Sequence, residues 1–270
     1  TRANFHVHGW SFSRSKSLSG RFYLLLEKAL YHITDDYIFV CNQDIEDFIQ
    51  LGGNKNIRQK SHVIYPGASF EASSSTTISK KDLRSTLNIR ENDYVIGNIA
   101  RLDDQKDPVS FVEVAKELLS ISNKNYKFLM IGSGSLELEI KALVESYNLK
   151  DNFIFTGFVD EVESYFKIFD AFVVCSKYEG LPITAVKALA SKSPVFSFKI
   201  NGMIDLSALY TSVHLINDRS TKEMAFMIEK ELNNTGATNI LEQESILVKK
   251  EFSFRNMFSK TKSIYFTKIS

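Results

Sequence analysis

The sequence predicts an α/β fold with parallel sheets, organised in two parts of which the first is incomplete. Two observations lead to this prediction. From Tyr94 onward, short apolar runs alternate with stretches of helical spacing, as is typical of a parallel sheet covered on both faces. A shorter alternation of the same kind precedes residue 70, and the polar, low-complexity stretch 71–80 separates the two parts.

Composition and charge are those of a globular protein and exclude several classes. The 270 residues include 33 basic and 32 acidic side chains, a net charge of +1, which offers no electrostatic basis for binding nucleic acid. Cys41 and Cys175 each follow an apolar run, so we interpret them as buried small side chains rather than as a disulfide or a metal site. The sequence has no apolar run long enough for a spanning helix, and it indicates a reducing, cytoplasmic setting.

The first part of the chain is expected to form three strands and two helices. The strands are expected at 3–9, 37–41 and 62–65, and the helices at 17–34 and 43–50. One face of the first helix is apolar, with Leu18, Phe22, Leu25, Ala29 and Ile33. Three strands and two helices leave a sheet edge and a face uncovered, so we expect that further strands precede this chain, which begins with Thr1.

The second part is expected to continue with strands and helices in turn. Its strands are expected at 94–100, 128–131, 152–156, 171–174, 194–198 and 213–216. Its helices are expected at 108–120, 135–147, 161–166, 183–190, 221–232, 240–250 and 254–266, with a short piece near Asp205.

The clearest candidate for a binding site follows the expected strand 171–174. Residues 176–180 form a short loop, Pro182 suits a first helical turn, and Glu179 places a carboxylate just before the helix. In an open parallel sheet, phosphates bind to the unpaired N–H groups at such a helix N-terminus. We therefore expect this loop to face a nucleotide-linked substrate.

Two cations at another strand end fit the same chemistry. Arg101 and Lys106 flank the turn that follows strand 94–100 and opens the next helix. An arginine fork and a lysine point charge together suit a diphosphate. The alternative is a pair of solvated surface cations, balanced by Asp103 or Asp104, and the residues alone leave both interpretations open.

Gly157 and His8 are weaker candidates. Gly157, which precedes Phe158 and Val159, either lets the backbone approach a planar base or simply forms a turn. His8 ends an expected strand, where a histidine can accept a proton near neutral pH, although a lone histidine is more often structural.

The N-terminal helix region has two interpretations. Aromatic residues interleave there with basic ones, namely Trp10, Phe12, Phe22 and Tyr23 among Arg14, Lys16, Arg21 and Lys28. Such a surface can dock on anionic lipid head groups as a peripheral membrane contact. In the other interpretation, the apolar members are the core face of the helix.

Taken in order, these segments resemble the family 4 retaining glycosyltransferases (glycosyl transferases group 1) over nearly the whole chain. The segments concerned are Ile99-Ala100-Arg101-Leu102 with Gln105-Lys106-Asp107, Ile131-Gly132-Ser133-Gly134, Phe155-Thr156-Gly157-Phe158-Val159, Ser176 to Ala188, and Phe252-Ser253-Phe254 with Tyr265. The stretch from Ser176 to Ala188 is the most specific, because it resembles the family pattern S-x-x-E-G-x-P-x-x-x-x-E-A.

The resemblance implies a glycosyltransferase B-type fold, with the acceptor bound to the first Rossmann-like domain and a nucleotide-sugar donor to the second. Residues 1–70 would be the C-terminal part of the acceptor-side domain and 71–80 the linker. Residues 81–251 would form the donor domain, and 252–270 a terminal helix that crosses back to the first domain. The family needs no metal or other cofactor.

The resemblance also implies roles for individual residues. Arg101 and Lys106 would hold the diphosphate and stabilise the charge of the leaving group. Glu179 would accept hydrogen bonds from the donor sugar, and His8 would face that sugar, which makes these two the catalytic candidates. The remaining donor-binding candidates are Gly157, Phe158, Val159, Gly180, Leu181, Pro182 and Lys187.

The sequence departs from the family pattern at two places. Lys187 occupies the position of a second glutamate, which in the family accepts hydrogen bonds from the ribose diol, whereas an ammonium only donates. Either the ribose is held differently, or Lys187 contacts phosphate, or donor binding is impaired. The segment Asn201-Gly202-Met203-Ile204-Asp205 lies where the family usually has two glycines and a glutamate.

The sequence thus predicts a retaining hexosyltransferase that uses a UDP- or GDP-linked donor and a glycan or lipid-linked acceptor. Its expected role is cell-surface polysaccharide or lipopolysaccharide biosynthesis, in the cytoplasm at the inner face of the membrane, with no nucleic-acid partner. The alternative is a catalytically impaired nucleotide-sugar-binding relative, which Lys187 suggests. An epimerase or phosphorylase of the same fold is a third class, which no residue favours.

Overall fold

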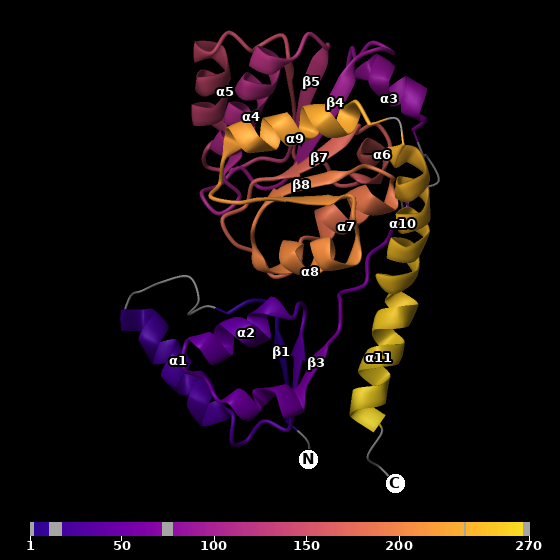
Figure 1. Cartoon of the computed structure of the whole chain (residues 1–270). Helices are drawn as coiled ribbons and strands as arrows, with labels where there is room; N and C mark the ends of the chain where they lie inside the picture. Colours follow the sequence, from indigo (N-terminus) through magenta and orange to yellow (C-terminus); the bar gives the residue numbers. More distant parts are fainter. Residues whose placement is uncertain (1–2, 11–17, 72–77, 235, 267–270) are drawn as a thin grey trace.

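The computed structural model describes residues 3–10, 18–71, 78–234 and 236–266, and it contains two parallel sheets (Figure 1). The larger sheet has six strands in the order β6-β5-β4-β7-β8-β9, and the smaller sheet has three in the order β1-β2-β3. Every pairing between neighbouring strands in both sheets is parallel. The predicted α/β class with parallel sheets is confirmed.

The order of the larger sheet reverses between β4 and β7. The chain first runs outward through β4 (Tyr94–Ile99), β5 (Tyr126–Ile131) and β6 (Phe153–Gly157). It then returns to the other side of β4 and continues through β7 (Ala171–Val174), β8 (Val195–Phe198) and β9 (Val213–Ile216). Ligands of open α/β sheets bind at the carboxyl ends of the strands where such a reversal occurs.

Alternate residues of the larger sheet fill two separate cores. Ile96, Phe128 and Val173 belong to the core beneath α4 (Pro108–Ile121), α5 (Glu137–Ser146) and α9 (Thr221–Leu232). Val95, Leu129 and Phe172, each one residue away, belong to the opposite core. That core includes residues of α3 (Lys80–Thr86), α6 (Glu163–Phe166), α7 (Ile183–Ala190), α8 (Asn201–Leu209) and α10 (Ala237–Glu251). This alternation follows from the two-residue side-chain period of a strand.

The smaller sheet is covered on one face by its own helices and on the other by the last helix of the chain. Its strands are β1 (Asn4–Val7), β2 (Asp36–Phe39) and β3 (Ser61–Val63), and its helical elements are α1 (Leu18–Leu30), α2 (Gln43–Gln50) and a 3-10 turn (Lys55–Lys60). Figure 1 shows α10 and α11 (Phe254–Phe266) running from the larger sheet down beside the smaller one. Ile264 packs against Ile38 and Ile64, and the Tyr265 hydroxyl lies 3.0 Å from His6 Nε2.

The orientation of α1 corrects the expectation for its apolar face. Phe22, Leu25 and Ile33 are 59%, 63% and 69% exposed, so this face is not a core face in the described part of the chain. Trp10, for which the sequence left both a surface and a core position open, is 3% exposed and stacks on Phe48 at 5.1 Å between ring centroids. Its place in the core follows from packing on α2 rather than from spacing along the sequence. Phe12, Arg14 and Lys16 lie outside the described residues, as does the side chain of Arg21.

Two helices differ from the sequence-based expectation. α3 was not expected, because its seven residues bury only Leu83 and show no apolar periodicity. It begins where the Ser79 hydroxyl accepts a hydrogen bond from the Asp82 N–H at 3.1 Å. The short piece expected near Asp205 is the nine-residue helix α8.

Both cysteines are unpaired and buried, as expected. Burial raises the pKa of both thiols, so Cys41 and Cys175 stay protonated at neutral pH. None of the described helices combines the length and the apolar character needed to cross a membrane.

Candidate functional site

The loops that follow β4 and β7 meet at the carboxyl edge of the larger sheet. The Lys177 N–H donates to the Gln105 carbonyl at 2.8 Å, and Gln105 Nε2 donates to the Tyr178 carbonyl at 3.1 Å. These bonds join the loops because β4 and β7 are neighbours in the sheet. The structure thus brings together the two segments that the sequence analysis proposed for one site.

Lys106 and Glu179 form the centre of this site. Their side chains are 18% and 16% exposed, and Lys106 Nζ lies 2.7 Å from Glu179 Oε1. The Ser176 hydroxyl donates to the same carboxylate oxygen at 2.5 Å. Such a shielded pair presents one cation and one carboxylate within reach of a single ligand.

Arg101 differs from Lys106 in its surroundings. Its side chain is 67% exposed, and it contacts Asp103 Oδ2 at 3.1 Å and Gln105 Oε1 at 3.4 Å. The interpretation as a solvated cation balanced by Asp103 therefore describes Arg101, whereas it does not describe Lys106. An exposed pair of this kind contributes little to stability.

Gly180 and Gly202 allow the loop after β7 to pack between the smaller sheet and α8. A Cβ atom at Gly180 would lie 2.9 Å from both the His8 carbonyl oxygen and Val40 Cγ2. A Cβ atom at Gly202 would lie 1.9 Å from the Gly180 carbonyl oxygen. Glycine is therefore required at both positions.

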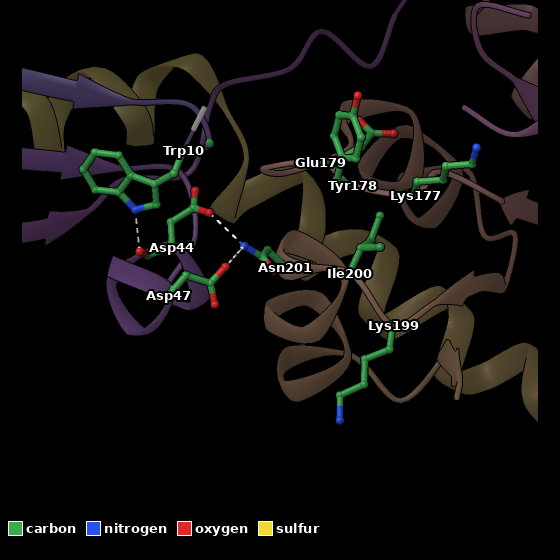
Figure 2. A pocket seen from close by; sticks show the side chains of 10 residues that line it. Trp10, Asp44, Asp47, Lys177, Tyr178, Glu179, Lys199, Ile200 and Asn201 are labelled. Atoms are coloured by element: carbon green, nitrogen blue, oxygen red, sulfur yellow. Dashed lines mark hydrogen bonds between the residues drawn. The ribbon is translucent and has the colours of Figure 1, made fainter. Parts of the chain in front are cut away.

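Two cavities border Glu179, and loops and helices that adjoin both sheets line each of them. The first measures about 270 Å³ and is lined by His8, Gln105 and Ile183 beside Glu179. The second measures about 340 Å³ and is lined by Asp44 and Asn201 beside Glu179 (Figure 2). His8 is exposed at the end of β1, so the structure places both catalytic candidates at the first cavity.

A polar network forms the wall of the second cavity and joins α2 to α8. Asn201 Nδ2 donates to Asp44 Oδ1 at 2.9 Å and to Asp47 Oδ2 at 2.8 Å, as Figure 2 shows. Asp205 Oδ2 accepts from the Asn42 N–H and from Asn42 Nδ2, each at 2.8 Å. Burial raises the pKa of Asp44, and the neighbouring carboxylates add to the shift. Sequence analysis missed this network, because its partners are about 155 residues apart and no motif links them.

The other candidates lie at three further places. Leu181 and Pro182 are buried, and Leu181 belongs to the core of the larger sheet, so these two side chains support the loop. Gly157 has φ +69°, and no atom lies within 4 Å of a Cβ built there, which leaves room for a ligand. Phe158, which follows it, is 73% exposed.

Lys187 is paired with a carboxylate that the sequence analysis did not consider. Its Nζ atom lies 2.6 Å from Oε1 of Glu163 in α6, and the two side chains are 18% and 14% exposed. Lys187 is therefore neutralised within the protein rather than presented as a free cation. Within the described ranges, no three His, Cys, Asp or Glu residues are grouped so as to hold a metal ion.

Comparison with known proteins defines the class. The two parallel sheets match those of Anabaena HepE in complex with UDP-glucose, with a TM-score of 0.81 at 17% identity, covering 98% of this chain and 72% of that one. This is the B-type glycosyltransferase fold. The model of the family described as Glycosyl transferases group 1 matches residues 79–246, more than half of the chain, and the protein belongs to that family.

Two relatives illustrate the family. The chain is 29% identical over 201 residues to the Escherichia coli UDP-Gal:α-D-GlcNAc-diphosphoundecaprenol α-1,3-galactosyltransferase, covering 73% of this chain and 51% of that enzyme. It is 29% identical over 145 residues to the Staphylococcus aureus (strain COL) poly(ribitol-phosphate) α-N-acetylglucosaminyltransferase, covering 53% of this chain and 29% of that enzyme. The chain spans about half the length of the curated relatives that it matches over 201 residues.

Proposed function

We propose that the protein is a retaining hexosyltransferase that moves a sugar from a UDP- or GDP-linked donor to a glycan or lipid-linked acceptor. The observation that carries this proposal is the shielded Lys106–Glu179 pair at the reversal of the larger sheet. Two cavities border Glu179, and loops and helices that adjoin both sheets line them. A nucleotide sugar carries a diphosphate and several hydroxyl groups. The pair offers a cation for the diphosphate and a carboxylate for the hydroxyls.

The donor would occupy the carboxyl edge of the larger sheet. Lys106 and the N-terminal N–H groups of α7 would hold the diphosphate, because no side chain caps that helix. Arg101, which is largely exposed, would add a second cation as charge builds on the leaving group. The backbone at Gly157, with Phe158 and Val159, would lie against the base.

The sugar and the acceptor would meet beside Glu179. In the first cavity, Glu179 would accept hydrogen bonds from the donor sugar while His8 faces it. The second cavity, which Glu179 also lines, would receive the acceptor. The name of the E. coli relative specifies a diphosphoundecaprenol-linked acceptor, which supports a lipid-linked substrate and a role in cell-surface polysaccharide or lipopolysaccharide biosynthesis.

The proposed setting is the cytoplasm at the inner face of the membrane. The exposed apolar side chains of Phe22 and Leu25 in α1, and of Ile33 just after it, support a peripheral contact with lipid. In the same proposal, residues 1–70 form the C-terminal part of the acceptor-side domain, 71–80 the linker, and 81–251 the donor domain. The helix within 252–270 returns to the first of these.

Calorimetric titration with UDP, GDP and a panel of their sugars, followed by a transfer assay, tests the proposal. We expect one nucleotide to bind, with an affinity that Lys106→Met lowers and that Arg58→Met leaves unchanged. Arg58 and Glu46 form an exposed pair beside the smaller sheet, which makes Arg58→Met the matched control. If no nucleotide binds, the proposal fails. Binding without hydrolysis or transfer of any sugar supports instead the catalytically impaired relative suggested by Lys187.

A further inference from the structure

Arg219 joins the two loops of the candidate site from a third loop. It lies between β9 and α9, and its guanidinium donates to the Cys175 carbonyl at 2.7 Å and to the Ser176 carbonyl at 3.1 Å. The same group donates to Asp107 Oδ2 at 2.5 Å. Asp107 is the residue after Lys106 and the N-cap of α4, where its Oδ1 accepts from the Ser110 N–H.

These contacts close a ring around the Lys106–Glu179 pair. Lys106 contacts Glu179, Glu179 accepts from the Ser176 hydroxyl, and the Ser176 carbonyl accepts from Arg219. Arg219 then binds Asp107, which is covalently linked to Lys106. Both members of the pair are thereby tied to one guanidinium, Lys106 through its neighbour and Glu179 through Ser176.

The backbone around this ring is held in an unusual conformation. Asp107, Asp218 and Arg219 have φ values of +47°, +50° and +51°, in the left-handed region that residues other than glycine seldom adopt. Such conformations persist where the surrounding contacts determine them, and they gather at functional sites. The Arg219 guanidinium also lies 4.2 Å from the centroid of the Phe198 ring, which fixes its plane.

We propose that Arg219 is a positioning residue, which sets the distance between loops 101–107 and 176–180 and so the geometry of Lys106 and Glu179 toward a donor. The inference rests on the proposed function of that pair in donor binding. Only a planar fork with several donors can reach a carboxylate and two carbonyls on separate loops at once. A lysine at this position keeps the charge but not these simultaneous contacts.

Kinetics of Arg219→Lys and Arg219→Met, with Arg58→Met as control, test the proposal. A misplaced reacting group lowers turnover by up to about 100-fold, so we expect kcat to fall by about 10- to 100-fold in both variants. The donor KM should rise as well, because the pair is proposed to hold the donor, and the thermal midpoint should match that of Arg58→Met. Full rescue of kcat by lysine, or a kcat within about 2-fold of the control in both variants, overturns the proposal.

A double-mutant cycle separates positioning from a general loss of structure. If Arg219 acts through Ser176, then Ser176→Ala should add little to the loss already caused by Arg219→Met. If the losses of kcat in the two single variants add fully in the double variant, Arg219 does not act through Ser176, and the proposed ring of contacts is contradicted.

Hydrogen–deuterium exchange gives a readout that needs no activity. We expect Arg219→Met to speed exchange in residues 101–107 and 176–180 and to leave the smaller sheet unchanged. Unchanged exchange in both loops overturns the inference. If the wild-type protein binds no nucleotide, the proposed function fails, and exchange alone then decides whether Arg219 couples the loops.

Discussion

Two lysine–glutamate pairs lie at opposite ends of α7, and their environments are nearly the same. Lys106 and Glu179 are 2.7 Å apart before its first turn, with exposures of 18% and 16%. Lys187 and Glu163 are 2.6 Å apart in its second turn, with exposures of 18% and 14%. The first pair joins two residues that the sequence assigned to the site, whereas the second contains the residue that the sequence marked as a defect.

The difference shows how a departure from a motif should be interpreted. A lysine in place of a glutamate reverses the charge at one position, which in isolation suggests impaired binding of a polyol or sugar. The structure places a carboxylate from α6 beside that lysine, so the pair as a whole is neutral and still contains a carboxylate. A motif records residues along one segment, while the chemistry of a site depends on all the segments that meet there.

The largest effect is expected at the pair before α7. Lys106→Met and Glu179→Gln each remove a group that we propose to contact the donor, and loss of one such group costs roughly 100-fold or more in turnover. Lys187→Met and Glu163→Gln serve as the matched controls and should each lose less than about 10-fold. Steady-state transfer rates measure this contrast. Equal losses of transfer rate at both pairs would show that the Lys187–Glu163 pair contributes to transfer as much as the Lys106–Glu179 pair does.

A smaller effect, on stability, is expected at the second pair. Lys187→Glu would bring two carboxylates together where solvent screens them only partly. We expect the free energy of unfolding to fall by roughly 1–3 kcal/mol, less than for a fully buried pair. Urea unfolding measures the change.

The exchanged variant Lys187→Glu with Glu163→Lys is the control for this prediction. It restores an opposite-charge pair in the same place and should recover most of the lost free energy. If Lys187→Glu alone is as stable as the wild type, the proposed contribution of the Lys187–Glu163 pair to stability is contradicted. Donor binding by the exchanged variant then shows whether the family arrangement of charges improves affinity.

The smallest effect is expected at His214, a partly buried base that faces the Glu231 carboxylate. Burial lowers its pKa, and Glu231, 3.8 Å away, opposes the shift only in part. The folded state therefore binds fewer protons than the unfolded state, so stability is lost as the pH falls below about 6.5 toward the lowered pKa. His214→Gln should remove this loss of stability at low pH. Urea midpoints at pH 7.5 and 5.5 test the prediction, which an unchanged pH dependence in the variant would contradict.

Much of the fold followed from local patterns. The alternation after Tyr94 predicted the parallel larger sheet, because strands buried on both faces are continuous apolar runs. The meeting of Lys106 with Glu179 could also be foreseen, since the residues that follow parallel strands gather at one edge of the sheet.

Other features had no local signal. The apolar residues of α1 and of the turn after it repeat at helical spacing. Periodicity identifies a face without saying what covers it, and Phe22, Leu25 and Ile33 are exposed. Arg219 was missed because the sequence does not show whether the guanidinium of a loop arginine is solvated or contacts other loops. No spacing rule connects it with Asp107, 112 positions away.

The sequence by itself determined the class of fold, the strand ends that bear the site, and the family. Each of these depends on hydrophobic periodicity, turn residues and short motifs, which act within a few residues of one another. Only the tertiary structure decided which charges are neutralised, which aromatic residues are buried, and how the loop after β7 is held against the smaller sheet. Those properties depend on contacts between residues far apart in the chain, where shielding from water sets the strength of an ion pair and a missing side chain at Gly180 or Gly202 permits close approach.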